Sequence, residues 1–187
     1  MSEPQVLIPI ADGSEELEAV TLIDLLRRAR INVTVAGLSA EPVTCARGTV
    51  IIPDQSIDDV LSEQFDLMVL PGGLPGADNL NADPRIHQLI KRLNNDGKYV
   101  AAICAAPKVL VASGVANGKT ITAYPGALSE VDTANINLID EPVHIDGKVI
   151  TSRGPGTAMD FALTLIEILK DKATRDQVEA GLVRNTG

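Results

Sequence analysis

Short apolar runs alternate with helix-like segments along nearly the whole chain, and this alternation limits the fold more than any other feature of the sequence. Alternating β and α segments are typical of a mostly parallel sheet with helices on both faces. Hydrophobic residues make up 45% of the chain but aromatic residues only 2%, so the core must consist of Val, Leu, Ile and Ala. Such residues suit strands that are buried on both faces. The sequence therefore predicts a doubly wound α/β fold, with ligands beyond the carboxyl ends of the strands.

The pattern divides into strand-like and helix-like segments. Apolar runs predict strands over residues 5–11, 31–38, 65–73, 98–103 and 119–126, two short strands within 44–54 and a hairpin over 141–153. Periodic segments predict helices over residues 15–30, 56–63, 83–97, 106–114, 156–170 and 172–183. Ser14 is expected to cap the first helix, with Leu17 and Val20 on its buried side. No repeat or linker interrupts the pattern, so residues 1–187 are expected to form one domain.

Charge and apolar content argue against two classes of partner. The chain has 16 Lys and Arg residues against 25 Asp and Glu residues, a net charge of −9. Nucleic acid is not expected as a stable partner, because binding it requires a basic face. No apolar run approaches the roughly 20 residues that cross a bilayer, and the first residues lack the basic start of a signal peptide. We therefore expect a cytoplasmic protein with reduced thiols and no membrane partner.

Cys104 lies where a strand of small residues meets a helix that opens at Pro107. A residue at such a point can form the sharp strand-to-helix turn called a nucleophile elbow, which exposes its side chain above the sheet. Backbone N–H groups at the start of the helix would then stabilise a thiolate. The alternative is a buried and unreactive cysteine, since cysteine is among the most often buried residue types. Spacing alone leaves both interpretations open.

Gly72 and Gly73 end another predicted strand, and glycine pairs at such places are often plain turns. Their N–H groups could instead face the Cys104 thiolate and, with the N–H of Ala105, form an oxyanion hole. The surrounding PGGLPG lacks the Lys-Ser/Thr ending of a P-loop and the GxGxxG spacing. No nucleotide site and no cofactor are therefore expected.

Three glutamates, Glu15, Glu16 and Glu18, occupy the first turns of the first predicted helix. Acids there favour the helix dipole and solvent, which accounts for at least one of them. Glu18 stands among apolar neighbours, so its carboxyl group is expected to point towards the sheet and to have a raised pKa. Such a carboxyl group could donate a hydrogen bond to the thiolate or exchange a proton with it.

The two histidines are weaker candidates. His87 lies on a predicted helix face and His144 in the predicted hairpin, where surface or satisfied structural roles are the simplest interpretation. Two cysteines and two scattered histidines show no ligand spacing, so no metal is expected.

The segments GSEELEAV, LPGG, AAICAAP and TSRGPGT, in this order, resemble the ThiJ/PfpI family, in the branch of the Parkinson-associated protein DJ-one and its bacterial relatives. The resemblance spans about residues 5 to 183, and AAICAAP with TSRGPGT is its most specific part. It implies a flavodoxin-like fold and a homodimer. It also implies that Cys104 is a nucleophile with a strongly depressed pKa and a strained backbone.

The resemblance also implies roles for residues around Cys104. Glu18 matches a protonated glutamate that hydrogen-bonds the thiolate, and Gly73 and Ala105 match oxyanion-hole donors. The remaining matches are to pocket residues, with Arg28 approaching from the other subunit: Gly72, Arg28, Arg47, Tyr124, Arg153, Gly154 and Pro155. The other cysteine, Cys45, could be redox-active in its own right, but its alternating, strand-like stretch favours a packing role near the dimer interface.

Tyr124 is a departure from the family pattern. Members near the Parkinson-associated protein carry a histidine at the position that this chain fills with Tyr124, before Pro125. A tyrosine is a poor general base near neutral pH. Acid–base chemistry in this chain would therefore depend on Glu18.

These residues lead to three functional hypotheses. The first is a cofactor-independent glyoxalase or deglycase, in which Cys104 attacks methylglyoxal, glyoxal or an early glycation adduct and Glu18 moves the proton. The second is an oxidative-stress sensor or redox-regulated holdase chaperone, in which Cys104 is oxidised to sulfinic acid. The third, a protease- or amidase-like hydrolase, is disfavoured because no histidine stands beside Cys104.

Overall fold

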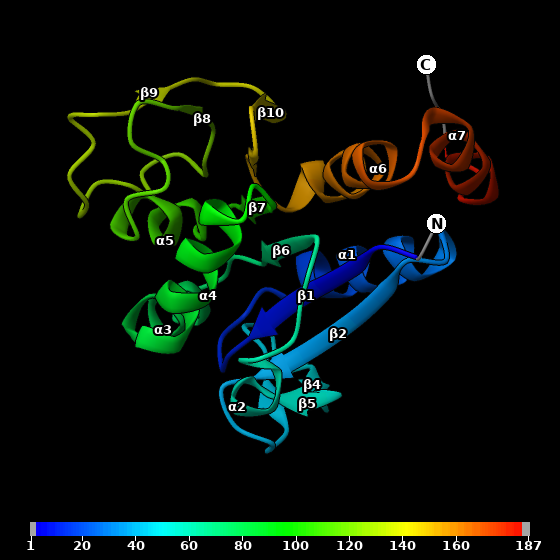
Figure 1. Cartoon of the computed structure of the whole chain (residues 1–187), viewed down its shortest axis with the longest axis horizontal. Helices are drawn as coiled ribbons and strands as arrows, with labels where there is room; N and C mark the ends of the chain where they lie inside the picture. Colours follow the sequence, from blue (N-terminus) through cyan, green and yellow to red (C-terminus); the bar gives the residue numbers. More distant parts are fainter. Residues whose placement is uncertain (1–2, 185–187) are drawn as a thin grey trace.

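Seven strands form the central sheet of the computed structural model, which describes residues 3–184 (Figure 1). Their order across the sheet is β10-β11-β7-β6-β1-β2-β5, and all neighbours are parallel except the β10–β11 hairpin. The bounds are β1 Gln5–Ile10, β2 Asn32–Gly37, β5 Gln55–Ser56, β6 Leu67–Leu70, β7 Tyr99–Ile103, β10 Val143–Asp146 and β11 Val149–Ser152. This arrangement confirms the predicted α/β class with a mostly parallel sheet.

Helices cover both faces of the sheet. Their bounds are α1 Glu16–Arg28, α2 Ile57–Val60, α3 Gly76–Ala82, α4 Pro84–Asn95, α5 Pro107–Ala112, α6 Ala158–Leu169 and α7 Lys172–Gly181. Val6 and Ile8 pack on one side in a cluster with residues of α1 and α6, whereas Leu7 packs on the other with residues of α4 and α5. Successive strand residues thus enter two separate aliphatic cores, as expected for a sheet buried on both faces.

Two short pairs of strands lie outside the central sheet. In the first, β3 (Val43–Thr44) and β4 (Val50–Ile51) are antiparallel, which confirms the pair predicted within residues 44–54. In the second, β8 (Thr120–Ile121) and β9 (Asn137–Leu138) are parallel. The strand predicted over residues 119–126 is therefore wrong beyond Ile121. The N–H of Thr122 donates to the side-chain hydroxyl of Thr151 in β11 (2.9 Å) and not to a backbone carbonyl of a ladder.

The first helix differs from its prediction in cap and exposure. It begins at Glu16 with Glu15 as N-cap, because the Ser14 hydroxyl is used elsewhere and accepts from the N–H of Ala11 (3.1 Å). Leu17 and Val20, expected to be buried, are 51% and 47% exposed. A second difference is α3, a seven-residue helix that begins at Gly76, where no helix is predicted. Its side chains are mostly small or polar, so the apolar period that predicts a helix is weak.

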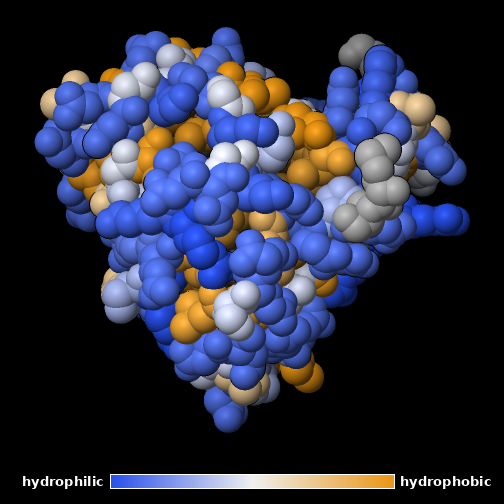
Figure 2. Space-filling model, in the orientation of Figure 1, coloured by the Kyte–Doolittle hydropathy of each residue, from blue (hydrophilic) through white to orange (hydrophobic). Residues whose placement is uncertain are grey.

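The polarity of the surface agrees with a fold in which most apolar side chains lie between the sheet and its helices. Most of the face in Figure 2 is hydrophilic, and hydrophobic atoms show in separate patches between polar residues. Within residues 3–184, no helix has both the length and the apolar character needed to cross a membrane.

Candidate active site

The carboxyl ends of β1, β6 and β7, three neighbours in the sheet, bring the predicted site residues together. The chain after β1 leads into α1 with Glu18, the chain after β6 provides Gly72 and Gly73, and the residue after β7 is Cys104. In an open α/β sheet this edge is where ligands bind. The predicted convergence of the three strand ends is therefore present.

Cys104 has a left-handed backbone with φ of 64°. Hydrogen bonds on both sides fix it: its N–H donates to the carbonyl of Ser152 (3.0 Å), and its carbonyl accepts from the N–H of Tyr124 (2.9 Å). A non-glycine residue in this region is strained by about 1–2 kcal/mol, and such strain is characteristic of functional sites. Unlike the expected exposed elbow, the residue is only 9% exposed. Sequence reasoning did not identify Ser152 as an anchor, although it lies within the TSRGPGT segment.

Glu18 is fully buried beside Cys104. Its Oε2 accepts a hydrogen bond from the N–H of Gly72 (2.7 Å), whereas its Oε1 is buried and has no partner among the described residues. Burial raises the pKa of Glu18 to about 7, while hydrogen bonds from Gly72 and Cys104 act in the opposite direction. The predicted orientation of Glu18 and its raised pKa thus agree with the structure.

Gly72 separates the thiol from the carboxyl group. A Cβ atom at this position would lie 2.7 Å from Cys104 Cβ and 2.8 Å from Glu18 Oε2. Both distances are well inside van der Waals contact, so only glycine allows the two side chains to approach. The N–H of Gly72, one of the two that could face the thiolate, donates to Glu18 instead, so Gly72 is a spacer between the two side chains and not an oxyanion donor.

Gly73 and Ala105 direct their N–H groups at the sulfur, and both lower the pKa of Cys104. Gly73 has φ of 90°, and a Cβ there would lie 2.4 Å from the backbone nitrogen of Glu15. Glycine is therefore required both by the conformation and by the close approach. The geometry fits the predicted pair of oxyanion donors.

The expected strong depression of the Cys104 pKa is not found. Burial first, and then the charge of Glu18, raise the pKa of the Cys104 thiol to about 12, against the N–H groups of Gly73 and Ala105. The charge of Glu18 disappears when Glu18 holds the proton, so the two groups titrate as a pair. A thiolate forms here when the Glu18 carboxylate takes up the thiol proton, and not independently of Glu18.

The other two glutamates have separate positions. Glu16 accepts from the N–H groups of Arg47 (2.9 Å) and Thr49 (3.3 Å) and so holds the turn between β3 and β4. Glu15 donates its own N–H to the carbonyl of Gly72 (2.9 Å). The side chain of Arg47 is exposed, and its guanidinium has no ion-pair partner within residues 3–184. The first helix thus supplies one buried acid and one acid that orders a loop.

Tyr124 borders a pocket of about 630 Å³ that also includes Arg153. Its side chain is 52% exposed, and its ring lies against Gly154, where an added Cβ would be 3.3 Å from the ring. Arg153 pairs with Asp140 (2.9 Å), and Pro155 opens a short 3₁₀ turn over Pro155–Thr157. These predicted pocket residues are therefore near one another, next to the backbone of Cys104.

Arg28 is at the opposite end of α1 from Glu18 and pairs with Asp24 (2.7 Å). Ten residues of helix span about 15 Å, so Arg28 is not part of the site of its own subunit. Its predicted approach from a partner subunit stays a prediction.

The remaining candidates have structural partners. His87 contacts the carbonyl of Asn81 (2.7 Å), and His144 contacts Glu141 (2.8 Å), which agrees with their predicted structural roles. Cys45 is buried in the β3–β4 turn, where burial raises the pKa of its thiol to about 11. The described part of the chain contains no group of three or more His, Cys, Asp or Glu residues that could hold a metal.

The sequence profile of the DJ-1/PfpI family matches residues 4–168. The chain belongs to the DJ-1/PfpI family. It is 43% identical over 186 residues to the Parkinson disease protein 7 homolog of Danio rerio, covering 98% of each chain. The crystal structure of DJ-1beta from Drosophila melanogaster has a TM-score of 0.94 and 42% identity, covering 98% of this chain and 100% of that one.

A third relative carries an activity in its name. The glutathione-independent glyoxalase DJR-1.2 of Caenorhabditis elegans is 39% identical over 165 residues, which cover 88% of this chain and 87% of that protein. The DJ-1/PfpI family thus includes enzymes of the glyoxalase type, and its members are commonly dimeric. The family named from four sequence segments is therefore confirmed.

Proposed function

We propose that this protein is a cofactor-independent glyoxalase of the DJ-1/PfpI family, acting on methylglyoxal, glyoxal or early glycation adducts. One observation supports this most: the fully buried Glu18 beside Cys104 has one oxygen bound to Gly72 and the other without a partner in the described chain. A buried carboxyl group with a pKa of about 7 can both accept and return a proton near neutral pH. The similarity to a named glyoxalase points in the same direction.

The first step is addition of the sulfur to the aldehyde. Glu18 takes the thiol proton of Cys104, and the thiolate attacks the aldehyde carbon, so that a C–S bond forms and the carbonyl π bond becomes an oxyanion. The N–H groups of Gly73 and Ala105, which already lower the pKa of the sulfur, are placed to stabilise that negative charge. Return of the proton from Glu18 gives the hemithioacetal.

The second step moves hydrogen between two carbons. The Glu18 carboxylate removes the proton from the former aldehyde carbon, giving an enediolate, and returns it to the adjacent carbon, while the hydroxyl proton passes from the first oxygen to the second. The product is a thioester of Cys104, which water hydrolyses to lactate, or to glycolate from glyoxal, with release of the thiol. The sequence adds one water and needs no external oxidant or reductant. The deglycase activity would reach the same hemithioacetal from a hemiaminal adduct: the C–S bond forms, the C–N bond breaks, and the free amine leaves with the thiol proton.

Tyr124 fits a mechanism that relies on Glu18 alone. Its backbone N–H supports the carbonyl of Cys104 (2.9 Å), while its ring packs against Gly154 and is half-exposed. Nothing in this position provides a second base. We therefore assign Tyr124 to the pocket wall and not to proton transfer.

Lactate formation from methylglyoxal by the purified protein tests the proposal. Wild type should form lactate, and Cys104→Ala should reduce the rate to background, while Cys45→Ser should retain the wild-type rate. Absence of lactate above the Cys104→Ala control would contradict the proposal.

Oxidation of Cys104 is the second candidate function. The N–H groups of Gly73 and Ala105 that face the sulfur could equally stabilise the oxygens of a sulfinate. Mild peroxide followed by peptide mass spectrometry should then modify Cys104 well before Cys45. Equal oxidation of the two cysteines would count against a sensor.

A further inference from the structure

The end of α1 that is distant from Cys104 carries a basic cavity that the proposed reaction does not use. Its volume is about 650 Å³, and its walls include Arg28, Arg30, Lys170 and Gln177 but no Asp or Glu. Such a volume is typical of sites for small molecules. In a chain with a net charge of −9, a cavity wall with three cations and no acid is unexpected.

Arg30 is the most informative residue of this cavity. It follows α1 with φ of 55°, and its N–H donates to the carbonyl of Arg27 (3.0 Å), while the N–H of Ile31 donates to the carbonyl of Leu26 (3.1 Å). These two bonds define a Schellman motif, in which the left-handed position is normally glycine. Arginine at this position is opposed by local backbone preference, so a role for its side chain is the simplest explanation.

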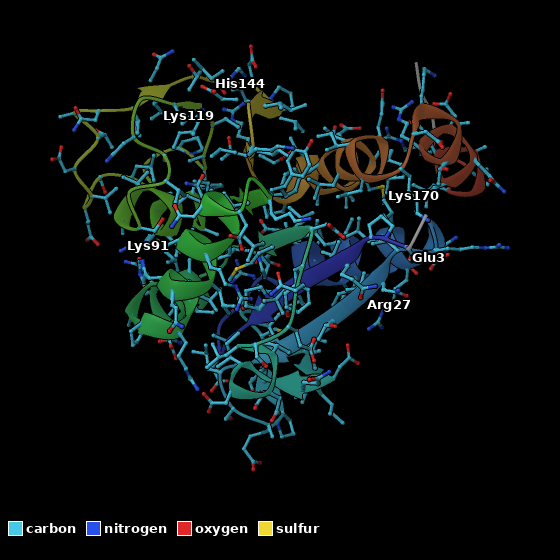
Figure 3. The ribbon with its side chains drawn as sticks, in the orientation of Figure 1. Glu3, Arg27, Lys91, Lys119, His144 and Lys170 are labelled. Carbon is cyan, nitrogen blue, oxygen red and sulfur yellow. The ribbon has the colours of Figure 1, made fainter. Side chains whose placement is uncertain are left out.

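The charges around the cavity leave the Arg30 guanidinium available. Arg28 is paired with Asp24 (2.7 Å), and Lys170 is only at the limit of ion pairing with Glu3 (4.0 Å). Figure 3 shows Lys170 and Glu3 next to each other at this end of the molecule. Asp171, which follows Lys170, accepts from the N–H of Thr174 (2.7 Å) as the cap of α7. Among the described residues, Arg30 has no ion-pair partner.

We propose that this cavity binds a small phosphorylated molecule, with the phosphate held by Arg30 and Lys170. A guanidinium presents a planar pair of donors that matches phosphate oxygens, and an ammonium adds a second positive charge. The amide of Gln177 supplies a polar group for the rest of the ligand. Of the predicted pocket residues, only Arg28, which is expected to approach the partner subunit's site, lines this cavity, and the phosphate ligands Arg30 and Lys170 have no part in the glyoxalase proposal.

Calorimetric titration with pyrophosphate, at ionic strength matched with sodium chloride, tests this site. Wild type should show saturable binding that weakens as salt is added. Arg30→Gly and Lys170→Gln should each bind about tenfold more weakly or worse, the effect of losing one strong charge-assisted hydrogen bond. Arg30→Gly is a suitable variant because glycine suits the left-handed backbone, so its Tm should be no lower than that of wild type.

Lys91→Gln is the matched control for the loss of one positive charge. Lys91 is on α4, on the other side of the molecule from Lys170 (Figure 3), and it borders a different pocket. This variant should bind pyrophosphate as wild type does. No saturable binding to wild type, or equal weakening by Lys91→Gln and Arg30→Gly, would overturn the proposal.

Discussion

Cys104 and Arg30 have almost the same left-handed backbone, with φ of 64° and 55°, but they are held in it by different means. Cys104 is 9% exposed, and carbonyl and N–H groups from distant segments, Ser152 and Tyr124, hold its backbone. Arg30 is exposed and is held by bonds to the preceding turn of its own helix. The first conformation depends on the assembled sheet edge, and the second only on a helix end.

The backbones of Cys104 and Arg30 are therefore strained for different reasons. At Cys104, the tertiary structure enforces the conformation and places the sulfur between two N–H donors and Glu18. At Arg30, glycine would suit the backbone better, so the strain reflects the choice of side chain. Substitutions at the first site should therefore affect chemistry strongly, whereas substitution at the second should improve stability.

The largest effect is expected for Cys104→Ala. Without the nucleophile, the hemithioacetal cannot form, and the rate of lactate formation should fall by at least about 10³-fold. The fold should persist, because alanine is smaller than cysteine and the bonds to Ser152 and Tyr124 are made by the backbone. Steady-state kinetics with methylglyoxal, combined with circular dichroism, measures both. Residual activity within tenfold of wild type would remove Cys104 from the mechanism.

Glu18→Gln should reduce activity by about 10²-fold or more, because the proton shuttle is lost. It should also change the pH dependence of stability. The folded state raises the pKa of Glu18 to about 7 from its ordinary value of 4.5, so wild-type stability should fall as pH rises through this range. The expected loss is about 3 kcal/mol relative to Glu18→Gln. Urea unfolding at several pH values measures it, and parallel curves for the two proteins would contradict the assignment.

Gly72→Ala should destabilise the fold by about 1–3 kcal/mol, as overpacking of a filled core does. The added methyl group would meet Cys104 Cβ and Glu18 Oε2, so activity should be lost together with stability. Gly156→Ala is the matched control, because a Cβ there meets nothing within 4 Å. Urea unfolding of both variants provides the comparison. Equal stabilities would show that a methyl group fits between Cys104 and Glu18, which these distances do not allow.

Arg30→Gly should have the smallest effect, and of the opposite sign. Glycine removes the backbone strain of a non-glycine residue in the left-handed region, which should raise the free energy of unfolding by up to about 1 kcal/mol. Lactate formation should be unchanged. A loss of stability in urea unfolding would mean that the Arg30 side chain contributes contacts that outweigh its backbone strain.

Much of this arrangement could be predicted from local patterns. The strands before Gly72 and Cys104 were identifiable because they are continuous apolar runs, and their carboxyl ends meet because parallel strands place them at one edge. Glu18 could be identified by its apolar neighbours within the first helix. The family segments then favoured the prediction of a reactive Cys104 over that of a packing residue.

Other features depend on contacts that no local pattern contains. The Ser14 hydroxyl bonds back to Ala11, so the helix cap moved to Glu15. The Thr151 hydroxyl takes the N–H of Thr122, which ends the strand expected there. Leu17 and Val20 fit the apolar period of α1 but face outward, a position that suits a dimer interface. The direction of the Cys104 pKa was wrong because burial and the Glu18 charge depend on tertiary packing.

The pH profile of Cys104 alkylation by iodoacetamide, resolved by peptide mass spectrometry, tests most directly whether Cys104 and Glu18 share one proton. In wild type, reactivity should rise with a midpoint near the Glu18 pKa of about 7, because loss of one proton from the pair makes thiolate available. In Glu18→Gln, the charge that raises the pKa of Cys104 is absent, so reactivity should lack the midpoint near 7 and rise to a single midpoint that burial alone still keeps above the ordinary thiol value. Superimposable profiles for the two proteins would show that Cys104 ionises alone and would contradict the account.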